Sequence, residues 1–374
     1  MTPDLDLSDL PVPAQKALAP DAPPPLRLMA ARGVLPGLKP AEIVTVVALL
    51  TDSAEPSIAE TARATLAKLP APLLTGALAA DLRAAVIDKL ARAHPNQHDL
   101  IERILRMPRI ARDTLEHLAD VADEKSGELI ATNERLMLEH PTVIEKLYMN
   151  KRVRMSTADR LIELAVRNDL ELGIAAYREA AQAIKNELIA EPSDEPTYDD
   201  VVFSEITRRA EQTHLGDDED THELDEEGEE RVRAPFVPLH AIIGELTVTQ
   251  KIRRAMLGTS AERLLLVRDA NRLVAQAAVK SPLMKENEAM QISASRAVSE
   301  DVLRTIAQSR EFTRHYQVKL NLVSNPRTPF TFAARLLPHL RESDVRILAK
   351  SKNVSGAIAQ AAQQTMLRKS GKTR

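Results

Sequence analysis

The stretch that decides the fold is "VKLNLVSNPRTPFTFAARLLPHLRESDVRILAKSKNVSGAIAQAA", residues 318–362. Its end, "IAQAA" from Ile358, matches "VAQAA" from Val274, and its "VSNPRTP" has a counterpart in "VKSPLM" from Val279. Similar helical segments that are each followed or preceded by a proline-containing junction indicate an internal repeat.

A shift of 42 residues aligns apolar positions throughout residues 240–368, and a shift of 46 aligns residues 93–119 with 139–165. Each unit is predicted to hold two helices, one starting after a polar cap and one ending at an X-Pro junction. Periods of this length with two or three helices fall in the range of HEAT and armadillo repeats. The aligned columns are Leu264, Ile306 and Leu348; Val274, Tyr316 and Ile358; and Ala278, Leu320 and Ala362.

The repeats over residues 38–190 and 240–368 resemble HEAT/armadillo-type α-solenoids. The junction "NPRTP" at residues 325–329 is similar to that of bacterial leucine-rich-repeat variant proteins. The resemblance implies an all-α fold, an α-solenoid of HEAT-like two-helix repeats. Solenoids of this kind are usually interaction scaffolds, and no catalytic residue is carried over. Two blocks of repeats are expected, separated by an acidic disordered linker.

The predicted organisation follows shifts in composition along the chain. Residues 191–235 contain seventeen Asp and Glu against four Arg, a charge density that opposes a packed core. The expected parts are a Pro-rich flexible arm (1–37), N-terminal helical repeats (38–190), an acidic disordered linker (191–235), basic C-terminal helical repeats (236–368) and a basic tail (369–374).

The net charge of −4 conceals a basic C-terminal block, in which residues 236–374 hold 23 Lys and Arg against ten Asp and Glu. Cations that repeat with the structural period are predicted to form one positive column, able to bind a phosphate backbone, an anionic membrane or an acidic protein segment. The alternative is a solvated surface with cations paired inside their own helices, as for Arg304 and Arg346. The candidate column is Arg268, Arg310, Lys352, Arg272, Arg314, Arg304 and Arg346.

The acidic linker contains one apolar stretch, "YDDVVFSEI" at residues 198–206. Two interpretations stay open: a short helix that docks on this chain, or a linear motif offered to another protein. The linker itself is placed to cover the basic column as a mimic of its ligand, or it only spaces the two blocks. The motif residues are Tyr198, Val201, Val202, Phe203 and Ile206.

Catalytic and metal-binding patterns are missing from the sequence. There is no Cys, His94 and His98 are separated by a proline, and "SGKT" at residues 370–373 lacks the earlier glycine of a phosphate-binding loop. We therefore infer no cofactor, metal or small-molecule substrate. The N-terminal residues lack the pattern of a signal peptide, and the longest apolar run is short, which predicts a cytoplasmic protein.

The leading interpretation is a non-enzymatic scaffold that binds a protein partner, with a basic C-terminal surface that the acidic linker covers. The first alternative is a protein that binds nucleic acid or anionic membrane under control of the linker. The second is a HEAT-like enzyme of the DNA-repair type. That alternative is disfavoured by the lack of Trp and by only nine scattered aromatic residues, because such sites stack an extruded base on aromatic rings.

Overall fold

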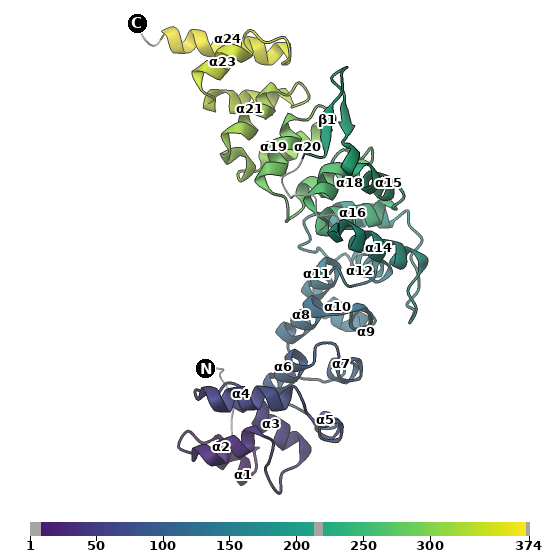
Figure 1. Ribbon diagram of the computed structural model, residues 1–374, viewed down its shortest axis with the longest axis vertical. Coiled ribbons are helices and arrows are strands. Elements are labelled where there is room, and N and C mark those ends of the chain that lie inside the picture. The colour runs from purple at the N-terminus through teal and green to yellow at the C-terminus, as the bar shows by residue number, and fades with distance from the viewer. Residues whose placement is uncertain (1–8, 213–219, 372–374) are drawn as a thin grey trace. The chain divides into compact units, whose positions relative to one another are not determined.

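The computed structural model describes residues 9–212 and 220–371, and within them the chain is all-α apart from one short β-hairpin (Figure 1). This confirms the predicted fold class at the level of all-α structure. Contacts divide the chain into two compact units, Met1–Leu161 and Ile162–Arg374, and the division falls within one helix. In the described residues no helix has both the length and the apolar character needed to span a bilayer.

Unit 1 is built from short helices in chain order. They are α1 (Val12–Leu18), α2 (Pro24–Ala31), α3 (Pro40–Leu50), α4 (Pro56–Leu66), α5 (Ala71–Leu78), α6 (Ala84–Ala93), α7 (His98–Leu105), α8 (Arg112–Val121), α9 (Glu124–Ala131), α10 (Glu134–Glu139), α11 (Pro141–Met149) and the start of α12 (Met155–Arg167). Helices two positions apart pack together, as α6 does on α8 and α7 on α9.

Unit 2 continues with helices and the hairpin. They are α13 (Tyr177–Ile184), α14 (Tyr198–Gln212), β1 (His222–Leu224), β2 (Glu230–Val232), η2 (Ala234–Phe236), α15 (Val237–Gly244), α16 (Val248–Leu257), α17 (Ser260–Leu266), α18 (Arg272–Lys280), α19 (Glu286–Ala294), α20 (Glu300–Gln308), η3 (Phe312–Arg314), α21 (Tyr316–Ser324), α22 (Phe330–Leu336), η4 (Leu337–His339), α23 (Glu342–Leu348) and α24 (Gly356–Gly371).

Prolines start helices in this protein. Pro24, Pro40, Pro56 and Pro141 are each the first residue of a helix, where the missing N–H would have had no partner in any case. The predicted flexible arm at residues 1–37 is therefore wrong over residues 9–37, which contain α1 and α2 with fully buried alanines. Residues 1–8 of that arm lie outside the described residues.

The repeat of unit 2 contains three helices instead of the predicted two. The triplets α16–α18, α19–α21 and α22–α24 follow one another, and in each triplet the third helix packs on the first. The middle helices begin at Ser260, Glu300 and Glu342, where the sequence predicts them. The structure does not show serine capping at these starts. Thr259, not Ser260, accepts the backbone N–H of Glu262, and neither Ser299 at α20 nor Arg341 at α23 forms a side-chain cap. The helix that the sequence analysis missed follows each proline junction.

The side chain of Asn325 holds the turn at the junction "NPRTP", residues 325–329. Its buried side-chain amide donates to the carbonyl oxygens of Ser293 (3.0 Å) and Ser295 (2.7 Å) at the end of α19. The side-chain carbonyl oxygen of Asn325 accepts the backbone N–H of Arg327 at 3.0 Å, and this hydrogen bond turns the chain toward α22. One side chain therefore satisfies the end of α19, ties it to the end of α21 and shapes the turn that precedes α22.

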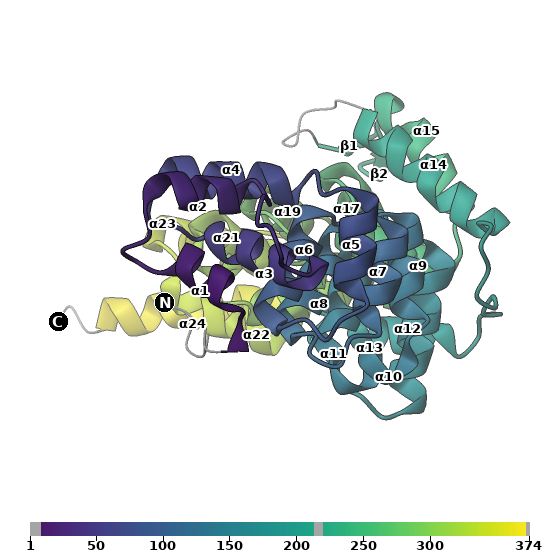
Figure 2. The ribbon, with the colours of Figure 1, turned by 90° about the horizontal axis from the view of Figure 1, so that it is seen from below.

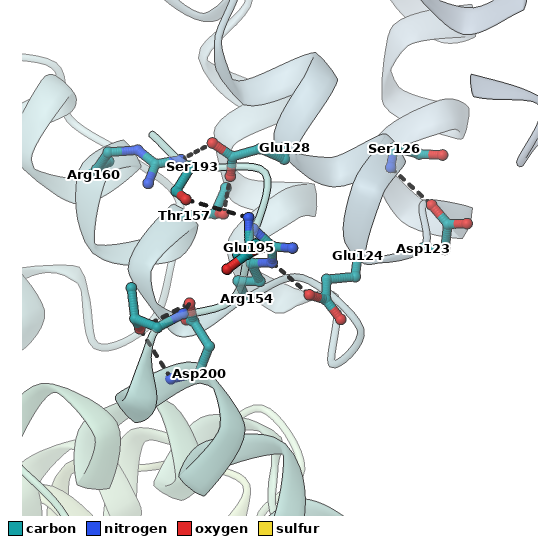
Figure 3. Close-up of polar contacts among 11 residues, drawn as sticks. Asp123, Glu124, Ser126, Glu128, Arg154, Thr157, Arg160, Ser193, Glu195 and Asp200 are labelled. Atoms are coloured by element: carbon teal, nitrogen blue, oxygen red, sulfur yellow. Dashed lines mark hydrogen bonds and ion pairs between the residues drawn. The ribbon is translucent and has the colours of Figure 1, made fainter. Parts of the chain in front are cut away.

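Unit 1 uses the same device at Asn150. The side-chain amide of this buried residue donates to the backbone carbonyls of Ala119 (3.0 Å) and Ala122 (2.9 Å). Its side-chain carbonyl oxygen accepts the backbone N–H of Arg152 at 3.0 Å. Beside it, α12 is tied to α9, since Arg154 pairs with Glu124 and Arg160 pairs with Glu128 (Figure 3).

The acidic segment is not a disordered linker in its described part, so the prediction for residues 191–235 is wrong there. Residues 198–212 form α14, whose Phe203, Ile206 and Ala210 are buried on one face. Residues 222–232 form an antiparallel hairpin, and its turn uses Gly228 at φ +80°. The number of acidic residues wrongly predicted disorder, because the carboxylates of α14 lie mainly on its exposed face and leave the other face free to pack. Residues 213–219 lie outside the described part of the chain.

The boundaries of the compact units also differ from the predicted blocks. The predicted N-terminal block ends at residue 190, yet α13 packs on α16 and α18, and Lys280 Nζ lies 2.7 Å from Glu179 Oε1. The first half of the predicted basic tail, residues 369–371, continues α24, and residues 372–374 lie outside the described part.

Replacing Asn325 with alanine is expected to lower the free energy of unfolding by about 2–4 kcal/mol, because two buried carbonyls lose their donor. Urea denaturation followed by far-ultraviolet circular dichroism measures the change. The matched control is Asn353→Ala, since Asn353 is exposed and only its backbone N–H is used, in a bond to Ser351. Equal stability of the two variants would show that the Asn325 amide is dispensable.

Candidate functional site

Arg268 does not belong to an exposed basic column, and this part of the prediction is wrong. Its side chain is only 13% exposed, and its guanidinium pairs with Glu230 of the hairpin at 3.1 Å. It also donates to the carbonyl of Leu264 at 2.7 Å. The acidic hairpin therefore covers this cation, which the sequence placed on the surface.

Three more of the predicted cations, two exposed and one (Arg304) half-buried, are paired with carboxylates of α20 or α23. Arg272 and Arg304 both contact Asp301, at 2.7 and 3.1 Å, and Arg304 also pairs with Glu300 at 3.0 Å. Arg346 pairs with Glu342 at 3.2 Å. The prediction that Arg304 and Arg346 are paired within their own helices is confirmed. Exposed pairs of this kind contribute little to stability.

The remaining three cations, Arg310, Arg314 and Lys352, are exposed, and no other side chain in residues 9–212 and 220–371 forms an ion pair with them. Arg310 and Arg314 lie in the connection between α20 and α21, and Lys352 lies between α23 and α24. Both connections join the second helix of a triplet to the third. These residues, which we name the free cations, are the part of the predicted column that remains available to a ligand.

The candidate motif of α14 is divided between the surface and the core. Tyr198 and Val201 are exposed, Val202 is half-buried, and Phe203 and Ile206 are buried. The ring of Phe203 lies under the guanidinium groups of Arg253 and Arg254, 5.2 and 5.7 Å from its centre. The structure thus places this segment as a helix docked on its own chain.

Beneath α14 lies a buried ionic layer that the sequence analysis missed. Arg254 pairs with Glu262, and Arg263 pairs with Glu288, each through two guanidinium nitrogens at 2.6–2.8 Å and with side chains at most 3% exposed. The sequence "TSAE", residues 259–262, has the pattern of a capping box, and it was the available signal for the position of Glu262. As in a capping box, Glu262 accepts the backbone N–H of Thr259 at 2.7 Å.

Gly258 is required by this layer. A Cβ atom at this position would lie 2.5 Å from the carbonyl oxygen of Arg254 and 2.7 Å from a carboxylate oxygen of Glu262. The backbone carbonyl oxygen of Gly258 accepts a hydrogen bond from the guanidinium of Arg263 at 2.6 Å. Any larger residue would therefore displace the Glu262 carboxylate that pairs with Arg254.

The hairpin is held to the helices by Glu230. Its carboxylate accepts hydrogen bonds from the Ser295 hydroxyl (2.7 Å), the Arg296 N–H (2.7 Å) and Arg268 (3.1 Å). Burial alone would raise the pKa of this carboxyl, but the Ser295 hydrogen bond, the charge of Arg268 and the Arg296 N–H together lower it. Glu230 therefore docks as a carboxylate.

Between the hairpin and the helices lies a groove of about 540 Å³. One wall is β1 with its preceding residues, and the other is formed by α19 and α21. His222 lies in this groove, where burial and the charge of Arg268 lower its pKa to about 4, so its ring is neutral at pH 7. Figure 2 shows the hairpin along the same side of unit 2 as α14 and α15.

The histidines considered as metal ligands have other partners. His94 Nε2 lies 2.8 Å from the carbonyl of Leu66, and His98 Nε2 lies 3.0 Å from Asp123. Across the described residues, no group of three or more His, Asp or Glu side chains is arranged to hold a metal ion.

Comparisons with protein-family models, with curated proteins and with solved structures give no match for this chain.

Replacing Glu262 with leucine is expected to destabilise unit 2 by about 3–5 kcal/mol, because Arg254 would stay buried without a counter-charge. The double variant Arg254→Met with Glu262→Leu should recover much of that loss. Urea denaturation of both single variants and the double variant gives the interaction energy. The control Glu342→Gln breaks an exposed pair and should change stability by less than about 0.5 kcal/mol. Additive effects at residues 254 and 262 would contradict this account.

Docking of the hairpin is expected to weaken on acidification. His222 has a lowered pKa when docked, so the released hairpin takes up a proton more readily between about 4 and its ordinary value of 6.5. The pKa of Glu230 is also lowered in the docked hairpin, so its stabilisation of docking is lost as the pH falls below the ordinary Glu value of 4.5. Arg268 and His240 further oppose protonation of His222, whereas Glu230 favours it.

Hydrogen exchange of residues 221–233, corrected for intrinsic rates, measures this effect. Opening should be more frequent at about pH 5 than at about pH 7, and His222→Gln should remove most of the difference. The amides of α18 serve as the internal control. Identical opening of the hairpin at both values would contradict the assignment to His222.

Proposed function

We propose that this protein is a non-enzymatic helical-repeat scaffold that binds an acidic segment of a partner protein through its basic C-terminal helices. The observation that carries the proposal is the set of free cations, Arg310, Arg314 and Lys352, which are exposed and lack ion-pair partners among the described residues. Cations left without internal counter-charges are available to an external anion.

The packing of successive triplets supports a solenoid of the HEAT or armadillo kind. In unit 2, α18 packs on α20, and α20 packs on α22, so each triplet contacts the next. Equivalent connections in a stacked repeat lie along one edge. The connection with Arg310 and Arg314 and the connection with Lys352 would then be neighbours on that edge and form one positive surface.

Composition of this region favours an acidic protein as its partner. Residues 302–374 contain fourteen Lys and Arg against three Asp and Glu. Phe330 and Ile347, 49% and 66% exposed, add apolar surface to the same helices. Apolar side chains among cations are typical of protein interfaces, whereas binding of a phosphate backbone relies chiefly on charge.

The hairpin shows what such a contact requires. Glu230 is an acidic residue in an extended segment, and it is received by an arginine, a hydroxyl group and a backbone N–H. An acidic partner segment would meet guanidinium and ammonium donors at the free cations. The acidic segment of this chain covers Arg268, and this supports a covering role at that position of the predicted column.

The test uses the full-length chain and fluorescent probes: a glutamate-rich peptide, single- and double-stranded DNA, RNA, and phosphatidylserine vesicles, each at several salt concentrations. The triple variant Arg310→Glu, Arg314→Glu, Lys352→Glu should weaken binding of the acidic peptide at least tenfold, because three attractive contacts become repulsive. Fluorescence anisotropy gives the affinities of the soluble probes, and vesicle co-sedimentation gives that of the membrane.

The control variant Lys68→Glu, Arg103→Glu, Lys125→Glu changes net charge equally at exposed positions of unit 1. It should leave peptide affinity within about twofold. Tighter binding of DNA or RNA, with a steep fall as salt rises, would replace the proposal by nucleic-acid binding. Equal losses of peptide affinity in both triple variants would show that net charge, and not the free cations, determines binding.

A further inference from the structure

The hairpin presents a free strand edge to the groove. Five consecutive residues, 220–224, line the groove, whereas β2 contributes only Glu230. Side chains of a strand alternate between its two faces, so a face would contribute every second residue. A continuous run is what the edge of a strand presents. The groove is therefore bounded by the edge of β1.

Backbone groups on this edge have no partner in the hairpin ladder. Thr221 pairs with Arg233 and Asp225 with Glu229 through backbone hydrogen bonds, and the register places Glu223 opposite Arg231. In an antiparallel ladder the intervening residues direct their N–H and C=O groups outward. His222 and Leu224 are those residues in β1. Their outward groups can pair with an added strand.

The opposite wall is suited to hydrogen-bond a peptide. Asn287 and Gln291 of α19 line it at helical spacing, together with Gln317 and Asn321 of α21. Gln317 donates to the side-chain carbonyl of Asn321 at 2.8 Å, and Asn321 donates to the Met290 carbonyl at 2.9 Å, which fixes both side chains. Carboxamides both donate and accept hydrogen bonds, as peptide backbone groups require.

The charge of the groove selects its ligand. Its lining includes the carboxylates of Asp220, Glu223 and Glu230, against the single cation Arg268, which Glu230 already neutralises. Asp220 and Glu223 are exposed. The groove therefore attracts cationic side chains and repels polyanions.

We propose that an extended segment of another protein, bearing lysine or arginine side chains, binds in this groove as a third strand added to the free edge of β1. The edge of residues 220–224 is about 16 Å long, which accommodates about five residues of an extended chain. Backbone pairing with His222 and Leu224 supplies affinity, and the two exposed carboxylates supply selectivity. This site is independent of the free cations.

The experiment titrates the full-length chain against a fluorescein-labelled peptide of alternating lysine and threonine, about six residues long, by fluorescence anisotropy. Leu224→Pro removes an outward N–H and leaves the ladder of the hairpin intact. It should weaken binding about tenfold. The matched control Val232→Pro removes an outward N–H from β2, on the other edge, and should leave affinity within about twofold. Circular dichroism verifies that both variants are folded.

Two further probes separate strand addition from charge attraction. The same peptide methylated on every backbone nitrogen keeps its charges and should bind at least tenfold more weakly. The peptide with glutamate in place of lysine should not bind. Equal binding of the methylated peptide, equal losses in both proline variants, or no binding by the unaltered chain up to millimolar peptide would each overturn the proposal. The triple variant of the free cations should bind the basic peptide normally, which keeps the two sites distinguishable.

Discussion

The structure depends on satisfying the backbone groups at the ends of very short helices. From α16 to α23 each α-helix has seven to ten residues, so its unpaired terminal N–H and C=O groups are about as numerous as its paired ones. Side chains in the turns supply the missing partners, and Asn325 and Asn150 do so most completely. Residues whose side chain accepts the N–H two positions later include Ser53, Asn150, Asp269, Ser281, Ser295, Asn325 and Ser351.

The second organising element is charge placed inside unit 2. Arg254, Glu262, Arg263 and Glu288 are buried as ion pairs, and Phe203 of α14 lies against the first of them. Burial of such groups is tolerated only when every partner is present. The position of α14 is thus coupled to the layer beneath it, and an acidic segment becomes part of the folded unit.

Several features of the fold could be predicted because they depend on local chemistry. The all-α class follows from helical periodicity and from the scarcity of glycine. The starts of α17, α20 and α23 lie close to the polar residues that predict them, although only α17 has a side-chain cap. The first helix of the second and third triplets, α19 and α22, was missed because proline was taken as a stop, although at Pro40 and Pro56 it is a start. The burial of Arg268 could not be predicted, since Glu230 is 38 residues away and the contact forms only in the folded chain. The groove depends on the same long-range docking.

The tight surroundings of Gly258 have an evolutionary consequence. Because a side chain there would collide with both Arg254 and Glu262, relatives of this protein should keep glycine at that position even where most surface residues have changed. The same relatives should keep arginine four residues before it, Thr-x-x-Glu-Arg directly after it, and glutamate 25 residues after that second arginine. Such spaced residues provide a search pattern for distant homologues whose overall similarity to this chain has been lost.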